Sequence, residues 1–250
     1  MRRLRTLVLN LQFWTLFFAV SAAIMSLYAV VVTAIRLTRS RRVTLRRLRR
    51  AISWYGACIL RCGYPWARVR YVDLAPQERE GPFIFVCNHR SASDPFMMAC
   101  LPFECIQVVN VWPFRLPFLG AIAKLAGYLS VRAMPVETFY EKAGQLLQQG
   151  VCVIAFPEGT RSVTRQAGPF NSSIFRLAER ERAAIVPIVL SGTEDMPHKG
   201  SLALHPGVVR VHKLPACRWE EYREMTTFQL KNHVRDLICQ HLAEIEGRAP

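Results

Sequence analysis

The first 72 residues contain no acidic side chain, since Asp73 is the first carboxylate in the sequence. The same segment carries 14 Lys and Arg residues and therefore holds +14 of the formal net charge of +15. Residues 73–250 contain 19 basic and 18 acidic residues, which leaves +1. A near-neutral body excludes a basic globular nucleic-acid binder, whose charge would lie on the folded domain itself. The sequence instead predicts a basic appendage on a near-neutral domain.

The sequence has no C-x-x-C pair among its eight cysteines, and its 13 Gly and 15 Pro follow no repeat. Cys87 and Cys152 lie inside apolar runs, where a thiol behaves as a small buried side chain. These patterns exclude collagen-like and low-complexity chains, and they argue against a disulfide framework or a structural metal site. With 51% hydrophobic residues, the chain can build a sizeable core, and its thiols suit a reducing compartment.

Residues 7–35 contain no charge, Gly or Pro over 29 positions. A helix of that length reaches ~43 Å at about 1.5 Å per residue, more than the ~30 Å hydrocarbon core of a bilayer. A cleavable signal peptide would share the basic start, but its apolar region covers only ~7–15 residues. We therefore predict a membrane-embedded helix over residues 7–35, followed by a basic amphipathic helix over residues 43–62.

Eight arginines lie between residues 36 and 50, directly after this apolar run. The positive-inside bias places the body of the protein in the cytoplasm, and we expect the inner membrane of a bacterium. Contact with anionic headgroups explains the cluster better than nucleic-acid binding, because the cluster adjoins an apolar helix. A single span and a helical hairpin in one leaflet both fit these charges. The expected organisation is a membrane-associated segment over residues 1–64 and an α/β domain over residues 65–250.

After Pro65, short apolar runs alternate with segments of helical periodicity. Apolar residues at i, i+3, i+4 and i+7 predict helices over residues 136–147 and 227–245, with Gly150 as a stop for the first. The alternation predicts the α/β class, with a mostly parallel sheet covered by helices and with sites where strands end. The expected strands cover residues 67–74, 81–88, 105–112, 127–132, 151–156, 183–190 and 207–214.

His89 and Asp94 follow the second of these apolar runs, in the stretch VCNHRSASDPF. We expect His89 to leave a strand and Asp94, followed by Pro95, to cap the next helix. The turn between them can bring the Asp94 carboxylate to one imidazole nitrogen, while the other nitrogen acts as a base. From spacing alone, a plain helix cap beside a loop histidine is the alternative. Because no serine nucleophile motif is present, the pair would activate a hydroxyl of the substrate.

A second polar turn follows the run VCVIAF and consists of Glu158, Gly159, Thr160, Arg161 and Ser162. The glycine lets the backbone approach a ligand closely, and Arg161 offers parallel donors to a phosphate or carboxylate. Glu158 would hold a hydroxyl or lock the arginine, with a surface ion pair as the alternative. Arg132, at the end of GYLSVR, is a third candidate. These residues predict a site for an anionic substrate with a free hydroxyl.

The chain resembles the glycerolipid acyltransferases, and among them the lysophosphatidic acid acyltransferases, in four ordered blocks: N-H-x4-D at 88–94, G-x-x-x-V-R at 127–132, F-P-E-G-T-R-S at 156–162 and V-P-I at 186–188. The resemblance implies that His89, oriented by Asp94, removes the proton from a glycerol hydroxyl. The oxygen then attacks the thioester of acyl-CoA or acyl carrier protein. It also implies that residues 158–162 and Arg132 hold the acceptor, that Pro187 shapes the donor side, and that no metal is needed.

The resemblance thus implies a membrane-bound O-acyltransferase of phospholipid biosynthesis, with the acyl thioester as co-substrate and no other cofactor. The expected partners are membrane lipids and a lysophospholipid such as lysophosphatidic acid, with no nucleic acid. The chain departs from the family's pattern at Asn110, Val131 and Asn171, where basic or acidic residues are common in the family. These departures leave another lysophospholipid or an amino-acid lipid open as acceptor. Hydrolysis of the thioester and a non-catalytic lipid-binding role are further alternatives.

Overall fold

The chain divides into two units by its internal contacts, in a computed structural model that describes residues 2–38, 40–111, 119–162, 166–198 and 200–247. Unit 1 comprises residues 1–70, 91–102 and 192–210, and unit 2 comprises residues 71–90, 103–191 and 211–250. The predicted membrane-associated segment, residues 1–64, lies wholly within unit 1. The predicted α/β domain contributes residues to both units.

A mixed sheet of six strands has the order β1-β6-β5-β2-β4-β3. Strand β2 pairs in parallel with both β4 and β5, and β3 pairs in parallel with β4. β2 and β4 are wholly buried, as is typical of parallel strands covered on both faces. The predicted α/β class is therefore confirmed. The strands are β1 (Ala67–Asp73), β2 (Phe83–Cys87), β3 (Cys105–Gln107), β4 (Cys152–Ala155), β5 (Ala184–Ser191) and β6 (Gly207–Lys213).

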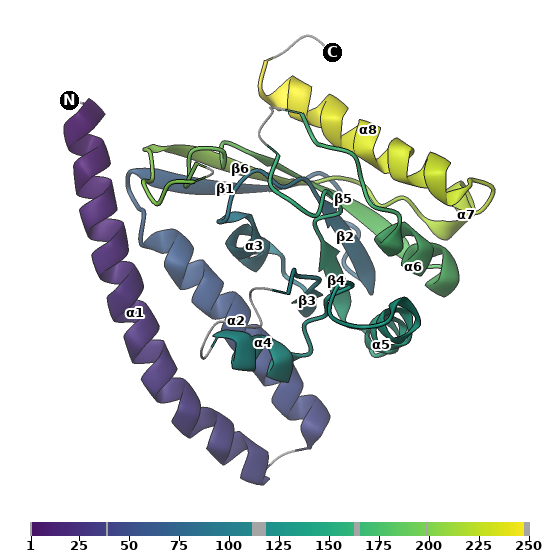
Figure 1. Ribbon diagram of the computed structural model, residues 1–250, viewed down its shortest axis with the longest axis horizontal. Helices are drawn as coiled ribbons and strands as arrows, with labels where there is room; N and C mark the ends of the chain where they lie inside the picture. Colours follow the sequence, from purple (N-terminus) through teal and green to yellow (C-terminus); the bar gives the residue numbers. More distant parts are fainter. Residues whose placement is uncertain (1, 39, 112–118, 163–165, 199, 248–250) are drawn as a thin grey trace. The chain divides into compact units, whose positions relative to one another are not determined.

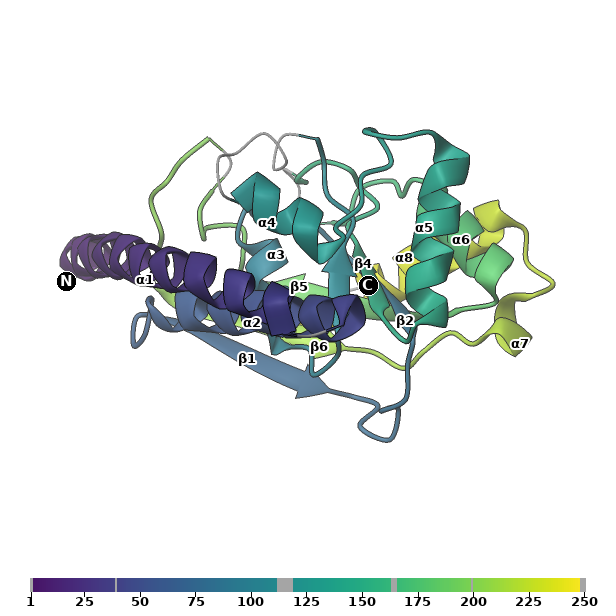
Figure 2. The same ribbon diagram turned by 90° about the horizontal axis from the view of Figure 1, so that it is seen from below.

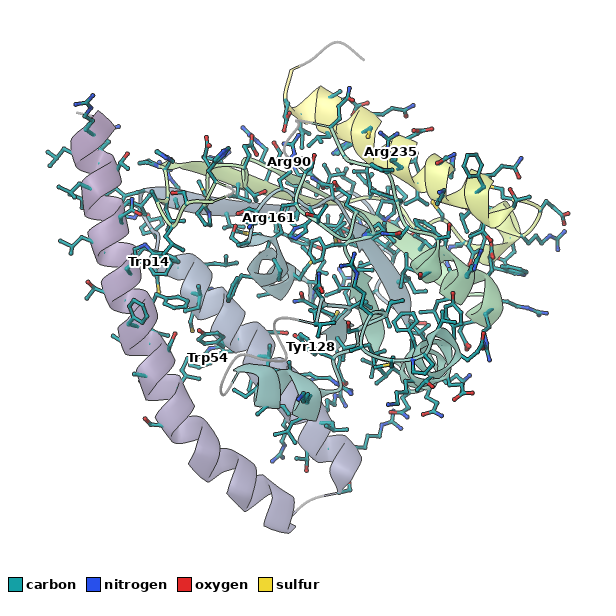
Figure 3. All side chains as sticks on the ribbon, viewed as in Figure 1. Trp14, Trp54, Arg90, Tyr128, Arg161 and Arg235 are labelled. Carbon is teal, nitrogen blue, oxygen red and sulfur yellow. The ribbon has the colours of Figure 1, made fainter. Side chains whose placement is uncertain are left out.

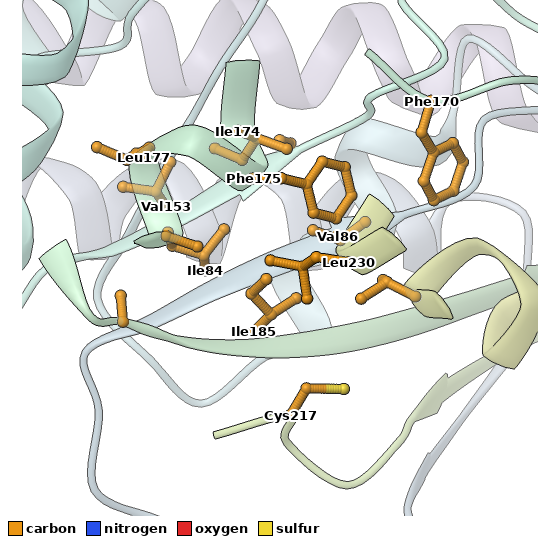
Figure 4. Close-up of a cluster of buried hydrophobic side chains, with 14 of the residues drawn as sticks. Ile84, Val86, Val153, Phe170, Ile174, Phe175, Leu177, Ile185, Cys217 and Leu230 are labelled. Atoms are coloured by element: carbon orange, nitrogen blue, oxygen red, sulfur yellow. The ribbon is translucent and has the colours of Figure 1, made fainter. Parts of the chain in front are cut away.

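Three helices of unit 2 pack against its strands: α5 (Val136–Gln148), α6 (Ser173–Glu181) and α8 (Thr227–Ile245) (Figure 1). Their apolar side chains form one buried cluster with alternate residues of the strands, among them Ile84, Val86, Val153, Phe175 and Leu230 (Figure 4). Burying each such side chain contributes about 1.5–3 kcal/mol, so this cluster holds the strand ends in fixed positions. The short helices α4 (Leu119–Ala126) and α7 (Trp219–Tyr222) also belong to unit 2.

The helices α5 and α8 lie where their periodicity predicts them. α5 ends before Gly150, whose φ of 79° is the left-handed conformation that glycine adopts without strain. α8 begins at a capping box, in which Thr226 is the N-cap and Gln229 is the third helical residue. Its buried face repeats at four-residue spacing and consists of Leu230, Val234, Ile238 and Leu242.

The two long helices of unit 1, α1 (Arg2–Thr38) and α2 (Arg41–Arg61), lie side by side (Figures 1 and 2). The Gln12 side chain donates to the backbone oxygens of Cys62 and Tyr64, and the Ser21 and Tyr55 hydroxyl oxygens are 2.8 Å apart. The stretch Arg3–Ile24 is long and apolar enough to cross a membrane, with a mean hydropathy of 1.8. The two predicted N-terminal helices are therefore present, and both begin earlier than predicted.

The predicted strand over residues 127–132 is wrong. Only Leu129 pairs, in an isolated parallel bridge with Val108. Gly127 has a φ of 84°, and the Ala133 N–H donates to the Ser130 oxygen at 3.2 Å, so the chain turns on both sides of Leu129. Arg132 therefore lies in a turn and not at the end of a strand.

Two predicted element boundaries also differ from the structure. The strand predicted over residues 105–112 ends at Gln107, and residue 112 lies outside the described part of the chain. The short helix α3 (Asp94–Met97) has Ser93 as its N-cap, so Asp94 is its first helical residue. Helix ends often shift by one residue, and the predicted helix start at the Asp-Pro pair is otherwise as expected.

Candidate active site

The residues Asn88, His89 and Arg90 follow β2 directly and form the base tripeptide, named for the predicted base His89. Asn88 is fully buried, and its side-chain amide makes two hydrogen bonds to one residue of β5. Its Nδ2 donates to the Leu190 oxygen at 2.9 Å, and its Oδ1 accepts from the Leu190 N–H at 2.8 Å. The side chain therefore continues the sheet pairing beyond the strand and fixes where the tripeptide begins.

His89 is half-buried at the end of β2, within unit 2. Its N–H donates to Glu158 Oε1 at 2.7 Å, and its carbonyl oxygen accepts from the Ser162 N–H at 2.7 Å. Its ring packs against Phe156, with ring centroids 4.8 Å apart. The backbone of the predicted base is thus tied on both sides to the turn after β4, which the sequence predicted as the second part of the site.

Glu158 fastens this turn to two parts of the backbone. Oε1 accepts from His89, and Oε2 accepts from the Gly168 N–H at 2.9 Å. A methyl group at Gly168 would lie 3.0 Å from Oε2, so glycine permits the contact. Both carboxylate oxygens thus have backbone donors within unit 2. The sequence predicted that Glu158 would bind a substrate hydroxyl or an arginine. It did not predict that Glu158 would accept hydrogen bonds from the backbone of His89 and Gly168.

Gly159 has a φ of 68°, the left-handed conformation that the sharp turn after β4 requires. A methyl group there would lie 3.2 Å from Asn171 Nδ2 and 3.9 Å from Arg132 Nη2. The turn therefore brings Arg132 beside Gly159 although Arg132 is not at a strand end. Asn171, where the family commonly has lysine, donates through Nδ2 to the Pro157 oxygen at 3.0 Å and braces the turn.

Thr160 is exposed, and Arg161 is half-buried at the same turn. Within the described part of the chain, the Arg161 side chain makes no hydrogen bond or ion pair, so its guanidinium has donors available for a ligand (Figure 3). Ser162 instead directs its hydroxyl to the Gln166 oxygen at 3.0 Å. The turn thus presents the guanidinium of Arg161, and the guanidinium of Arg132 lies nearby.

Arg90, labelled with Arg161 in Figure 3, is buried, with 2% of its side chain exposed. Its Nη1 is closely paired with Glu246 Oε1, just after the end of α8. The same oxygen accepts from the Ser191 hydroxyl at 3.0 Å, at the end of β5. No local pattern predicts this contact, because Arg90 and Glu246 are 156 residues apart in the sequence.

Asp94 belongs to unit 1, whereas His89 belongs to unit 2. Asp94 is fully buried, and its Oδ2 accepts from the Ser91 N–H at 2.7 Å, which closes the turn before α3. The Ser91 hydroxyl donates in turn to the Met196 oxygen at 2.8 Å. Asp94 is thus tied to the backbone of Ser91, and its pairing with His89 stays a prediction.

Pro187 lies inside β5, where it is opposite Val86 of β2. It is buried, and its carbonyl oxygen accepts from the Leu214 N–H at 3.0 Å. This position is unusual for proline, which cannot donate to a neighbouring strand. A role of Pro187 on the donor side stays a prediction. Among the described residues, no group of three or more His, Cys, Asp or Glu side chains could hold a metal ion.

A family model described as Acyltransferase matches residues 68–191 of this chain. A 1-acyl-sn-glycerol-3-phosphate acyltransferase of Cocos nucifera is 29% identical over 166 residues, which cover 64% of this chain and 54% of that protein. The 1-acyl-sn-glycerol-3-phosphate acyltransferase alpha of Homo sapiens is 32% identical over 174 residues, which cover 67% of this chain and 62% of that protein. The match therefore spans little more than half the length of these relatives.

The fold is similar to a crystal structure of the 1-acyl-sn-glycerophosphate acyltransferase PlsC from Thermotoga maritima. The two chains superpose with a TM-score of 0.80 at 20% identity, and the match covers 100% of each. At this level of identity the similarity shows the fold alone. The family model, by contrast, spans the base tripeptide, Asp94, Arg132 and the turn after β4, so the residues of the candidate site lie in the part of the chain that the family shares.

Proposed function

Because this chain belongs to the glycerolipid acyltransferase family, we propose that it moves an acyl chain from a thioester donor to the hydroxyl of a lysophospholipid such as lysophosphatidic acid. The donor is acyl-CoA or acyl carrier protein, and the reaction serves phospholipid synthesis. One observation carries the proposal. The structure anchors the backbone of His89 to Glu158 and Ser162, so a single imidazole is held beside a turn that contains Arg161 and Gly159.

The proposed reaction begins when one His89 imidazole nitrogen takes the proton of the acceptor hydroxyl. The acceptor oxygen forms a bond to the thioester carbonyl carbon, and the carbon–sulfur bond then breaks. The thiol group of the donor leaves with the proton that His89 carries, so the histidine returns to its neutral state. Asp94 would hold the imidazole in one tautomer and stabilise its charged form.

The acceptor phosphate is proposed to bind Arg161 and Arg132. Arg161 has available donors, and the Arg132 guanidinium lies beside Gly159 of the same turn. A guanidinium meets a phosphate with two parallel hydrogen bonds, and glycine at position 159 leaves the backbone open to it. Thr160, which is exposed at the turn, adds a hydroxyl. In this proposal Glu158 holds the turn in place and does not contact the acceptor.

The chain is proposed to lie on a membrane with α1 and α2 as a hairpin in one leaflet and with the body in the cytoplasm. The contacts of Gln12 with Tyr64 and of Ser21 with Tyr55 set an antiparallel register. Extended along the helices, this register places the arginines of residues 46–50 beside residues 26–30 of the apolar run. In a spanning pair, each arginine at the bilayer centre would cost about 2.5–3.5 kcal/mol. A hairpin at the headgroup level avoids that cost.

The experiment is a panel of lysolipid acceptors offered to the purified full chain with labelled acyl-CoA or acyl carrier protein. Mass spectrometry would identify the products, and the His89→Ala chain would serve as the control. We expect acylated lysophosphatidic acid from the wild-type chain and none above background from the control. Release of free fatty acid without any acylated lipid would show hydrolysis and would overturn the proposal.

A further inference from the structure

Unit 1 contains a groove of about 640 Å³, and none of the candidate active-site residues lines it. It lies between the end of α2, the start of β1 and the short helix η1 (Met98–Cys100). The helix α2 approaches η1 closely because residue 56 is glycine, and a methyl group there would lie 2.9 Å from the Ala99 Cβ. A volume in the range of about 300–1,000 Å³ is typical of sites for small organic ligands.

The walls of the groove are apolar. Ala57 and Leu60 come from α2, Ala99 and Cys100 come from η1, and β1 lines the groove along residues 67–70. Burial raises the pKa of the Cys100 thiol above its ordinary value, more than the nearby Arg61 lowers it. The thiol is therefore uncharged at neutral pH and adds to the apolar wall. Such walls suit the hydrocarbon or glycerol part of an amphiphile.

The rim of the groove is positive and has no carboxylate. Arg68 and Arg70 alternate with the inward residues of β1, so both project to the same side of the strand, about 7 Å apart. Within the described part of the chain, neither guanidinium makes a hydrogen bond or an ion pair. Arg61 gives one donor to the Ala57 oxygen at the end of α2. No acidic residue precedes Asp73, so nothing in this part of the sequence neutralises the rim.

We propose that this groove binds the headgroup of one anionic phospholipid of the bilayer. Arg68 and Arg70 would bridge its phosphate, and the apolar walls would hold the glycerol and the first acyl carbons. The same unit carries the candidate membrane helix α1, and Trp54 and Tyr64 are exposed on and just after α2, as is typical of residues at a membrane interface. A bilayer lipid therefore fits better than a soluble acyl donor.

The proposal goes beyond the transfer reaction, because this lipid is neither acceptor nor donor. A diffuse basic surface attracts anionic lipids without a fixed number, and salt screens it. A groove with two arginines and an apolar wall binds one lipid. Its affinity persists at salt concentrations that screen a diffuse basic surface. The number of lipids bound thus separates the two.

The test uses the full chain in a neutral detergent with phosphatidylglycerol as the probe, and native mass spectrometry counts the bound lipids. Arg68→Gln with Arg70→Gln removes two charges from the groove. Arg47→Gln with Arg50→Gln removes two charges from exposed positions of α2 and is the matched control. We expect one bound lipid for the wild-type and control chains. We expect at least about tenfold weaker binding for the groove variant, since each charged hydrogen bond contributes about 1.5–3 kcal/mol.

A second variant keeps every charge. Ala57→Leu adds volume to the apolar wall and narrows the groove, so it should also weaken phosphatidylglycerol binding. Thermal unfolding in detergent checks that this variant still folds. Acyl transfer to a short-chain acceptor in detergent should be unchanged in the groove variant, so failure of this proposal is distinguishable from failure of the proposed reaction. Equal losses in the groove and control variants, unsaturable binding, or displacement of the lipid by acyl-CoA or lysophosphatidic acid would each overturn the proposal.

Discussion

Polar side chains are used differently in the two units. In unit 2, each residue of the base tripeptide has a hydrogen-bond partner: Leu190 for Asn88, Glu158 for His89 and Glu246 for Arg90. The fully buried Lys213 donates to Asp73 and to the Ala75 oxygen. In unit 1, Arg68 and Arg70 project from the surface, and α1 leaves Leu4, Leu7 and Leu11 between 65% and 72% exposed. Buried polar groups with hydrogen-bond partners fix the positions of the backbone segments that they join. Exposed charged and apolar side chains are available to bind another molecule.

The comparison indicates that buried polar contacts fix the backbone of His89 in unit 2, whereas the N-terminal part of unit 1 exposes charged and apolar side chains, as its proposed contact with lipid requires. It yields predictions of different size. Removing the proposed base, His89, should have the largest effect. Loosening the contacts that support it should have the next, and altering an arginine of the proposed acceptor turn should have the smallest.

Replacement of His89 by alanine should lower kcat by about 10²–10⁴-fold, the usual contribution of a general base. The fold and membrane association should not change, because the contacts to Glu158 and Ser162 use the backbone of residue 89. Acyl transfer by the purified variant, with circular dichroism as a check of the fold, measures both. A variant that kept more than about a tenth of the wild-type rate would show that His89 is not the base.

Replacement of Glu246 by glutamine should destabilise unit 2 by about 3–5 kcal/mol, because it removes the negative charge that the buried Arg90 guanidinium contacts through Nη1. Urea unfolding in detergent measures this change. The matched control is Glu137→Gln, which breaks the exposed pair of Arg180 and Glu137, with 46% and 69% of the side chains exposed. That surface pair should contribute only about 0–1 kcal/mol. Equal losses would show that the Arg90–Glu246 contact has no special part in holding the tripeptide.

Replacement of Asn88 by alanine should cost about 1–3 kcal/mol for each of two groups, since the Leu190 N–H and the Leu190 oxygen both lose a buried partner. Asn88→Asp is the sharper variant, because it keeps the size and the acceptor but removes the donor to the Leu190 oxygen. Protection of the Leu190 amide from hydrogen exchange reports the contact directly. Unchanged protection in Asn88→Ala would contradict the bridging role.

Local pattern was enough to predict much of unit 2. The repeat of Leu230, Val234, Ile238 and Leu242 marks α8, and the buried run before Asn88 marks β2 and the edge where His89 lies. The motif blocks brought Arg132 and the turn after β4 together, and the structure places the Arg132 guanidinium beside Gly159. Those inferences depend on periodicity or on the ordered motif blocks of the family.

The missed features depend on contacts between distant parts of the chain. No sequence motif or periodicity links Glu246 with Arg90. In the same way, no local pattern predicts that Asn88 pairs with Leu190, which is 102 residues away. The false strand at 127–132 had the right alternation, but the positive φ of Gly127 and the turn after Ser130 limited pairing to Leu129. Tertiary context decides such cases, because a side chain or strand edge pairs only if the fold presents a partner.

The smallest effect tests the acceptor turn. Arg161→Lys keeps the charge but loses the fork that makes two parallel hydrogen bonds to a phosphate. One charged hydrogen bond contributes about 1.5–3 kcal/mol, so acceptor use should weaken by roughly 10–100-fold. Because the interaction would bind the acceptor before and during reaction, the apparent KM of lysophosphatidic acid should rise more than that of the acyl donor, whereas His89→Ala should act on kcat. Arg180→Lys, at an exposed position away from the turn, is the control and should change neither constant. If Arg161→Lys raised only the donor's KM, the turn after β4 would bind the phosphates of the donor, and the neutral residues at Asn110 and Asn171 would then point to an acceptor without a terminal phosphate.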